Sequence, residues 1–299
     1  MASRIFFSIC STALLFIFSI SHAYNANSKT VDLDKACNST LYVDYCKSVF
    51  KSNVSLTMHD YSRISVSKSL SAAKKFLQLV ESHLKNRQAS MTTIQALEDC
   101  QLVAGLNVDF LLESSVTINA TDTLSLVVID HVQTQLSATI TNHDSCLDSL
   151  NATASGQSVK NDLYSSLTDG TKLHSISLAF FVGGWVYTSN TGKVQKEGRK
   201  ALQASLCQAL VNVTVIVNQD GSGNFTTISD AIAAAPNNTN GGNGYFQIHV
   251  VEGVYQEYVT IGKNKKYIMI VGDGINRTVI TGNRSVGGGS TTFGSATLG

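Results

Sequence analysis

The stretch that decides the fold is residues 245–259, YFQIHVVEGVYQEYV, because residues 266–280, KYIMIVGDGINRTVI, repeat its pattern 21 residues later. Five pairs of positions carry the match: Phe246 with Tyr267, Ile248 with Met269, Val250 with Val271, Gly253 with Gly274, and Val259 with Ile280. Self-similarity at a fixed period near 20 residues is typical of solenoids. Short strands separated by glycine turns predict a parallel β-helix, in which each coil buries its apolar face against its neighbours. We expect about three coils in the residues up to Gly299.

The residues before this repeat predict one more strand and a short helix. Residues 211–217, VNVTVIV, alternate between apolar and polar side chains as a strand does. Gly221 and Gly223 then turn the chain, and residues 227–235 have the composition of a helix that Pro236 ends. The glycines follow a strand and precede a helix, as they would in a dinucleotide-binding fingerprint. A threonine replaces the third glycine and no strand–helix–strand unit with a suitable acidic residue follows, so we interpret the segment as a simple turn.

The uneven distribution of glycine predicts a helical region before the strands. Of the 22 glycines, only Gly105, Gly156 and Gly170 fall in the first 180 residues. The one proline, Pro236, compares with roughly 15 expected from average usage. Both residues destabilise helices, so a long stretch almost without them favours helix. Hydrophobic residues make up 43% of the chain, which argues against disorder as its general state.

Four segments of the first half have apolar residues at spacings of three and four, the pattern of amphipathic helices. Thr57 can cap the first, which we expect to run to about Leu84, and the second runs from Met91 to about Leu112. The residues expected to face inward are Met58, Tyr61, Ile64, Phe76, Val80 and Leu84; Ile94, Leu97, Val103, Leu106 and Phe110; Leu124, Val128, Val132, Leu136 and Ile140; and Leu163, Leu167, Leu173, Ile176 and Phe180. Short connections predict an up-and-down bundle. A ligand groove is the alternative use of the apolar stripes, and a bundle core is the simpler one.

The cysteines predict disulfide bonds and no metal site. They are Cys10, Cys37, Cys46, Cys100, Cys146 and Cys207. The four in the helical region permit three connectivities, of which the local one, Cys37 with Cys46 and Cys100 with Cys146, is the simplest. On the loop-entropy model these bonds stabilise the fold by about 3 and 4 kcal/mol. Cys207 is then a free thiol or an intermolecular partner. No Cys-x-x-Cys pair occurs and the seven histidines are scattered, so zinc is not expected.

The N-terminus has the order of a secretory signal peptide. Arg4 precedes the apolar run 5–20, and Ser21-His-Ala23 places small residues at the −3 and −1 positions of a cleavage site. A membrane anchor is the alternative, but a run of about 16 residues is short for a span. We therefore expect residues 1–23 to be removed and the rest to be secreted. Nine Asn-x-Ser/Thr sequons are candidates for glycosylation in that compartment: Asn38, Asn53, Asn119, Asn151, Asn212, Asn224, Asn237, Asn276 and Asn283.

Charge and hydropathy exclude two classes of partner. The net charge is +1, from 22 Lys and Arg against 21 Asp and Glu, so no general polyanion-binding surface is implied and nucleic acid is not an expected partner. No segment after the signal peptide is long and apolar enough to cross a bilayer, so no membrane association is expected once the signal is cleaved.

Short motifs along the chain resemble those of plant cell-wall proteins. In the first half, the cysteine pair Cys37 and Cys46 and the motifs LEDC (97–100), LSAT (136–139) and DSCLD (144–148) resemble the plant invertase/pectin methylesterase inhibitor domain. In the second half, the motifs that resemble the opening of the plant pectinesterase catalytic domain are QDGSGNFTTISDAI (219–232), GVYQEYV (253–259), VGDG (271–274), VITGN (279–283) and TTFGSAT (291–297). Together they cover almost all of the chain that follows the signal peptide.

The resemblance implies a secreted pro-pectinesterase. Its fold would be an all-α up-and-down four-helix bundle followed by the N-terminal part of a right-handed parallel β-helix. The expected divisions are a signal peptide over 1–23, an inhibitor-like pro-region over 24–188, a linker over 189–210 and an incomplete pectinesterase domain over 211–299. The extracellular plant cell wall is the expected location.

The resemblance also implies a chemistry. The family removes methyl esters from the galacturonates of pectin without a metal or cofactor, using one aspartate as nucleophile and a second as general acid/base. Those aspartates, the glutamines that stabilise the oxyanion and the orienting arginine belong to motifs that the 299 residues do not contain, so we expect no catalytic residue and no esterase activity here. Asp220, Asp230 and Asp273 stand in turn or short-helix contexts and are not expected to substitute. Thr292 matches a family position that contacts substrate.

Processing and partners follow from the same resemblance. Arg199, Lys200, Ala201 and Leu202 resemble the basic site at which such pro-regions are cleaved, with Ala201 in place of a leucine. Methyl-esterified pectin is the expected substrate of the family. As an alternative function, the bundle would bind a pectinesterase catalytic domain and block it. A third possibility is a non-functional product, because about three coils expose strand edges.

Overall fold

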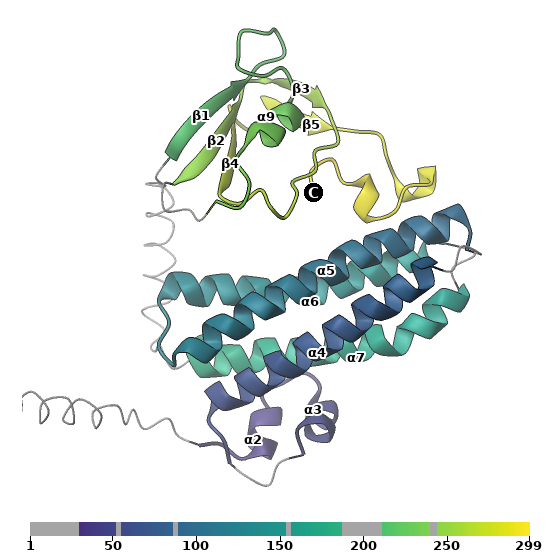
Figure 1. Ribbon diagram of the computed structural model, residues 1–299, viewed down its shortest axis with the longest axis vertical. Coiled ribbons are helices and arrows are strands. Elements are labelled where there is room, and N and C mark those ends of the chain that lie inside the picture. Colours follow the sequence, from purple (N-terminus) through teal and green to yellow (C-terminus); the bar gives the residue numbers. More distant parts are fainter. Residues whose placement is uncertain (1–29, 52–54, 86–88, 154–156, 187–210, 240–243) are drawn as a thin grey trace, which may run out of the picture.

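The computed structural model describes residues 30–51, 55–85, 89–153, 157–186, 211–239 and 244–299. The earlier ranges form a helical bundle and the last two form a part built of parallel strands (Figure 1). The predicted signal peptide and its cleavage site, the residues of the predicted processing site from Arg199 to Leu202, Cys207 and the sequon at Asn53 lie outside the described residues.

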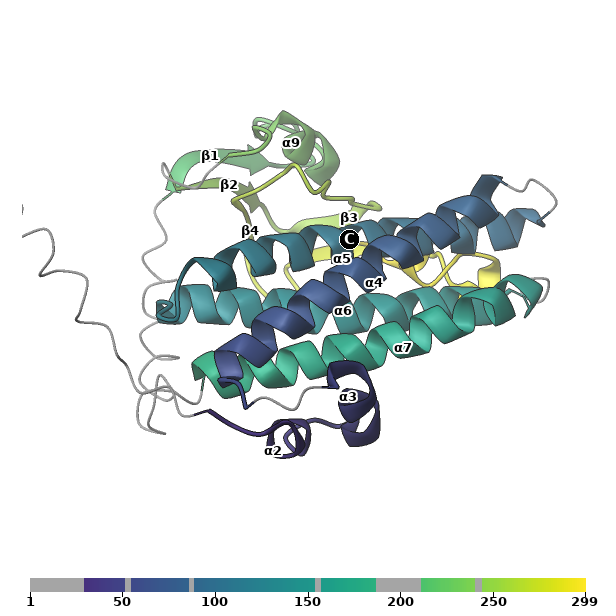
Figure 2. The same cartoon turned by 60° about the horizontal axis from the view of Figure 1, so that its bottom comes forward.

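Four long helices make the bundle, which confirms the predicted fold of this region. They are α4 (Met58–Lys85), α5 (Met91–Ala120), α6 (Leu126–Asn151) and α7 (Gln157–Phe181), and the π-helix η1 (Val182–Val186) continues α7. Each helix packs on the next and α7 closes against α4 (Figure 2). Serines begin two of them, since Ser90 Oγ accepts the Thr93 N–H at 3.3 Å and Ser125 Oγ accepts the Val128 N–H at 3.4 Å.

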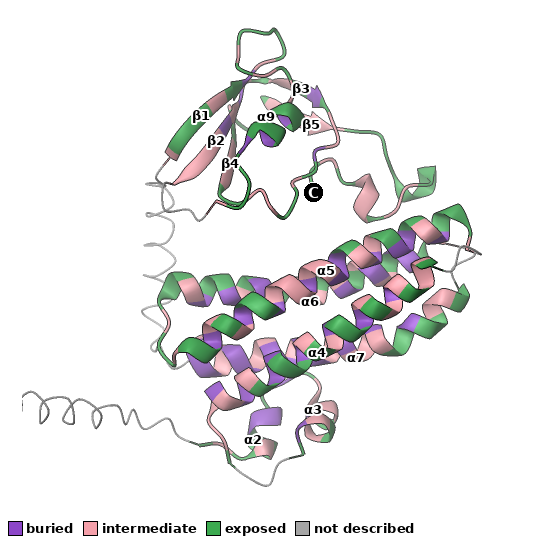
Figure 3. Ribbon diagram, viewed as in Figure 1, coloured by how far each residue is buried: buried purple, intermediate pink, exposed green. Residues whose placement is uncertain are grey.

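The helices differ from the predicted ones at their ends and at some core positions. The second extends to Ala120 instead of Leu112, and the third starts at Leu126 and reaches Asn151. Polar residues in the interior of these two helices interrupt the apolar pattern: Asn107, Ser114, Gln135, Thr139 and Ser149 are buried. Ile64, predicted to face inward, is 38% exposed. Figure 3 shows that the buried residues of all four helices face the bundle interior.

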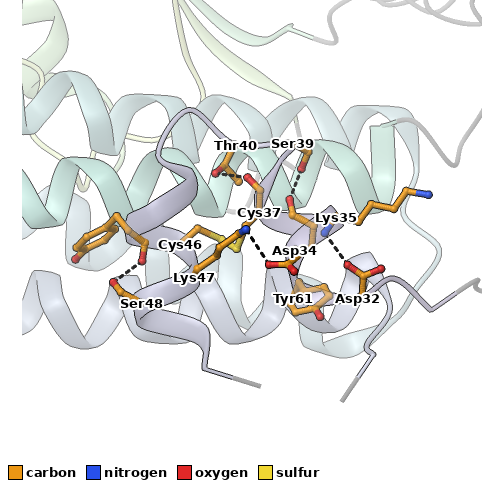
Figure 4. The surroundings of a disulfide bond; sticks show 12 residues. Asp32, Asp34, Lys35, Cys37, Ser39, Thr40, Cys46, Lys47, Ser48 and Tyr61 are labelled. Atoms are coloured by element: carbon orange, nitrogen blue, oxygen red, sulfur yellow. Dashed lines mark hydrogen bonds and ion pairs between the residues drawn. A yellow bond between two sulfur atoms is a disulfide. The ribbon is translucent and has the colours of Figure 1, made fainter. Parts of the chain in front are cut away.

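Two short helices, α2 (Leu33–Cys37) and α3 (Val43–Phe50), cover one side of the bundle (Figure 4). A disulfide between Cys37 and Cys46 joins them. Asp32 caps α2 by accepting the Lys35 N–H at 2.7 Å. A second disulfide, Cys100–Cys146, joins α5 to α6, so the local pairing expected from the sequence is the one in the structure.

The strand part consists of two parallel sheets, which confirms the start of a β-helix. Its elements are β1 (Val211–Val217), α9 (Ile228–Ala234), β2 (Tyr245–Val250), β3 (Gly253–Gln256), β4 (Ile268–Gly272), β5 (Thr278–Thr281) and the 3₁₀ turns η2 (Val286–Gly288) and η3 (Phe293–Ser295). One sheet has the order β1-β2-β4 and the other pairs β3 with β5. Their inner faces and α9 share one core, which contains Val217, Ile228, Ile248 and Tyr255.

The fixed period of 21 residues is wrong as a guide to strand pairing. Ile248 on β2 pairs with Ile270 on β4, a separation of 22 residues, and Tyr255 on β3 pairs with Ile280 on β5, a separation of 25. A shift of one residue exchanges the two faces of a strand. Ile270 therefore packs against the core, whereas Val271, which the repeat matched to an inward residue, is 37% exposed. Gly253 likewise pairs with Thr278 and not with Gly274.

The segment that resembled a dinucleotide fingerprint is a tight turn. Gly221 has φ +82°, and a Cβ at Gly223 would lie 2.6 Å from the Ile216 carbonyl oxygen. Both positions therefore require glycine for backbone reasons. Among the described residues, no helix is long and apolar enough to span a bilayer.

Candidate functional site

The segment 291–295 contacts the helical bundle at Asp99. The half-buried Asp99 carboxylate on α5 accepts hydrogen bonds from the Thr291 hydroxyl and from the Phe293 backbone N–H, and also from Ser149 Oγ on α6 at 3.2 Å. Burial raises the pKa of Asp99 above its usual value, and these hydrogen bonds offset part of that rise because they favour the ionised form. The carboxylate thus links two helices of the bundle to one turn of the strand part.

The sequence places this carboxylate beside a covalent link. Cys100 follows Asp99 directly, and its partner Cys146 lies one turn before Ser149 on α6. The disulfide holds α5 and α6 together at the level of the carboxylate, so the two groups that meet the segment 291–295 have fixed relative positions.

Two further contacts join the strand part to the bundle. The Phe293 side chain packs against a core cluster of the bundle that contains Leu97, Cys100, Cys146 and Leu150. Lys263 Nζ lies 2.8 Å from Asp109 Oδ2 on α5. Both views of the fold place the strand part along α5 and α6 (Figures 1 and 2).

Thr292, the candidate substrate-contacting residue, lies between the two residues that bind Asp99. It is exposed and begins η3 without a side-chain capping bond, while its carbonyl oxygen accepts the Ser295 hydroxyl at 2.8 Å. Its neighbours Thr291 and Phe293 are held by the bundle. The arrangement can fix the backbone around Thr292 and limit what reaches it from the side of the bundle.

Each carboxylate that we did not expect to be catalytic has a local structural partner. Asp220 Oδ1 accepts the Ser222 N–H at 2.8 Å, and hydrogen bonds from Ser222 lower the pKa of Asp220. Asp230 accepts the Thr227 hydroxyl at 2.6 Å at the start of α9. The pKa of Asp273 is lowered chiefly by a hydrogen bond with the side chain of His249 on β2. Within the described ranges, no three His, Cys, Asp or Glu side chains gather as metal ligands would.

The sequons remain predictions. The asparagines of the eight described ones are all exposed: Asn38, Asn119, Asn151, Asn212, Asn224, Asn237, Asn276 and Asn283.

Sequence reasoning missed the Asp99 and Lys263 contacts. Asp99 belongs to the LEDC motif, which by itself predicts no role for this side chain. Residues 99 and 291 are far apart in the chain, as are Asp109 and Lys263, and a local pattern carries no signal for such pairs.

The fold and its contacts define a class of protein, and comparison with known families agrees. Residues 32–180 match the plant invertase/pectin methylesterase inhibitor family, and residues 214–299 match the pectinesterase family. The chain therefore belongs to the pectinesterases that carry an inhibitor-like domain before the pectinesterase domain. It is 43% identical over 288 residues to "Probable pectinesterase/pectinesterase inhibitor 20" of Arabidopsis thaliana. The matched region covers 85% of this chain and 50% of that protein.

A second curated relative agrees with this assignment. The chain is 40% identical over 308 residues to "Probable pectinesterase/pectinesterase inhibitor 41" of Arabidopsis thaliana, covering 88% of this chain and 54% of that protein. Among solved structures, pectin methylesterase from carrot matches with 46% identity and a TM-score of 0.27 over 28% of this chain and 25% of that one. The chain spans about half the length of these curated relatives.

Proposed function

We propose that this chain belongs to a secreted plant pectinesterase that removes methyl esters from cell-wall pectin. In this proposal residues 24–188 are an inhibitor-like pro-region, residues 189–210 are a linker that carries the processing site, and residues 211–299 begin the pectinesterase domain. The pro-region binds the pectinesterase domain over the segment around Thr292 and keeps pectin away from it.

The observation that carries this proposal is the pair of hydrogen bonds from Thr291 and Phe293 to Asp99. A carboxylate that loses water on burial needs donors in return, so Asp99 favours the docked arrangement in which it has three. A hydroxyl and a backbone N–H are also donors that a galacturonate carboxylate would use. Asp99 would therefore compete with pectin for groups on either side of Thr292.

The experiment compares Asp99→Ala with Glu98→Ala, because Glu98 is the exposed neighbour on the same helix. The measurement is the hydrogen-exchange rate of the Phe293 backbone amide. The protein is the full chain, secreted by an expression host. Asp99→Ala removes the acceptor, and we expect that amide to exchange about tenfold faster or more, since one such bond contributes about 1.5–3 kcal/mol. Glu98→Ala should leave its exchange rate unchanged. Equal rates in Asp99→Ala and the wild type would refute the docking.

A second candidate function is inhibition of a separate pectinesterase by the bundle. It is favoured by the match of residues 32–180 alone to the inhibitor family. The readout is methanol release from methylated pectin by carrot pectin methylesterase in the presence of the chain. If the bundle is occupied by its own strand part, the Asp99→Ala and Lys263→Ala double variant changes the inhibition relative to the wild type. If neither protein slows methanol release at micromolar concentration, the second function is excluded.

A further inference from the structure

Two histidines face each other in the interior of the bundle. His143 on α6 is 2% exposed and His174 on α7 is fully buried, and their ring centroids are 4.7 Å apart. Phe76 on α4 packs against the first ring, with 5.2 Å between the ring centroids. Gly170 on α7 leaves the space for that ring, because a Cβ there would lie 2.3 Å from His143 Cε1.

The hydrogen bonds of this pair are incomplete. A ring N–H of His143 donates to the Leu167 carbonyl, and Thr171 Oγ1 lies 3.5 Å from His143 Nδ1. Among the described residues, no partner meets His143 Nε2 or either ring nitrogen of His174. A buried imidazole with an unpartnered nitrogen can remain neutral at a modest cost, whereas a buried imidazolium requires a counter-charge.

Among the described residues, no counter-charge faces the two rings. Within the described parts of α4, α5, α6 and α7, the pKa of His174 is influenced by one other ionisable group, His143, which lowers it, and the pKa of His143 by none. The ionisable neighbours along the same helices point outward: Asp144 is exposed, and Asp169 pairs with Lys172 at 3.2 Å on the surface. Protonating either ring would therefore place an uncompensated charge between α6 and α7.

We propose that the His143–His174 pair makes the α6–α7 contact of the bundle acid-labile, so that protonation of either ring opens the bundle. Burial lowers the pKa of His143 to about 4 and that of His174 well below its usual value. An unfolded histidine titrates near pH 6.5. The stability that the neutral pair supplies is complete above that pH and is lost as the pH falls toward the folded values. The inference does not depend on the proposed docking to the strand part.

The test measures urea unfolding by circular dichroism at pH 7.5, 6 and 5 in the secreted chain, in His174→Leu and in His131→Gln. His131 is the matched control, because it lies on α6 with a side chain that is 56% exposed. Between pH 6 and pH 5 each buried histidine should raise the unfolding equilibrium constant by up to about tenfold. His174→Leu should lose one such factor, while His131→Gln keeps both. An unchanged pH dependence in His174→Leu would overturn the proposal.

A second measurement decides the matter if His174→Leu does not fold. Nuclear magnetic resonance of the imidazole C–H groups in the wild-type chain follows each ring separately. We expect His143 and His174 to keep their neutral chemical shifts between pH 7.5 and 5.5. Titration of the buried rings near pH 6.5 in the folded chain would contradict the proposal as firmly as an unchanged variant.

Discussion

Lys263 Nζ lies 2.8 Å from Asp109 Oδ2, and this ion pair joins the strand part to α5 at a second point, ten residues after Asp99. The lysine side chain is 71% exposed and the aspartate 47%, so water and salt reach the pair freely. The partly buried contacts of Phe293 and Asp99 therefore supply most of the binding, and the ion pair chiefly orients the two parts.

Removing the ion pair should weaken docking slightly and in a salt-dependent way. In a double-mutant cycle of Lys263→Ala and Asp109→Ala, we expect a coupling of about 0.5 kcal/mol in the opening free energy of the Phe293 amide, measured by hydrogen exchange. The coupling should vanish in 1 M salt. The exposed Arg277–Glu252 pair, which lies within the strand part at 2.6 Å, serves as control and should show no effect on this amide. A coupling above about 2 kcal/mol would contradict this description.

Neighbouring threonines should behave differently when each is changed to alanine. Thr291→Ala removes one donor to Asp99 and the Oγ1 atom that accepts the Gly294 N–H at 2.9 Å, so the segment should loosen by about 1–3 kcal/mol. Thr292→Ala removes an exposed side chain with no capping bond and should leave exchange in the segment unchanged. Hydrogen exchange across residues 291–295 distinguishes the two. Equal effects would show that Asp99 does not hold Thr291.

The two disulfides should contribute unequally to the stability of the bundle. Replacing Cys100 and Cys146 by alanine opens a loop of 46 residues and should lower the free energy of unfolding by about 4 kcal/mol. Replacing Cys37 and Cys46, which are nine residues apart, should lower it by about 3 kcal/mol. Urea unfolding followed by the fluorescence of the single tryptophan, Trp185, measures both. A larger loss from the shorter loop would reverse the expected order.

Two glycines in the helices should respond in opposite directions to alanine. Gly170→Ala places a Cβ against the buried His143 ring and should destabilise the bundle by about 1–3 kcal/mol. Gly105→Ala on α5 meets no atom within 4 Å and should stabilise it by about 0.5–1 kcal/mol, because alanine favours helix. Thermal unfolding of both variants checks the signs. A stable Gly170→Ala variant would mean that the His143 ring can move away.

The class of fold could be predicted from the sequence because it depends on local patterns. Every residue predicted to face inward on α7 is buried: Leu163, Leu167, Leu173, Ile176 and Phe180. The pattern failed on α5, where Asn107 and Ser114 lie inside the bundle. Asn107 Nδ2 donates to the Thr139 carbonyl at 3.0 Å, and Ser114 Oγ donates to Gln135 Oε1 at 3.0 Å. A polar residue whose partner is on another helix looks exposed in a single sequence.

Strand register and the candidate site could not be predicted in the same way. The coils have different lengths, and α9 lies between β1 and β2, whose paired residues Val215 and Ile248 are 33 apart. The Thr291–Asp99 contact depends on how the bundle and the strand part meet. Neither the LEDC motif (97–100) nor the TTFGSAT motif (291–297) contains that information.

The buried end of α7 has a consequence for the proposed cleavage. Trp185 is 2% exposed in η1, where it meets His59 edge-on at 4.3 Å between ring centroids, so the described core of the bundle extends to the end of η1. A cut near Arg199 would leave the described core intact and would break the covalent connection between the bundle and the strand part. Docking would change from a first-order process at an effective concentration of about millimolar to a second-order one set by dilution. The same surface contacts would then be strong enough to hold the pro-region before the cut, but too weak to hold it after the cut, when it can diffuse away.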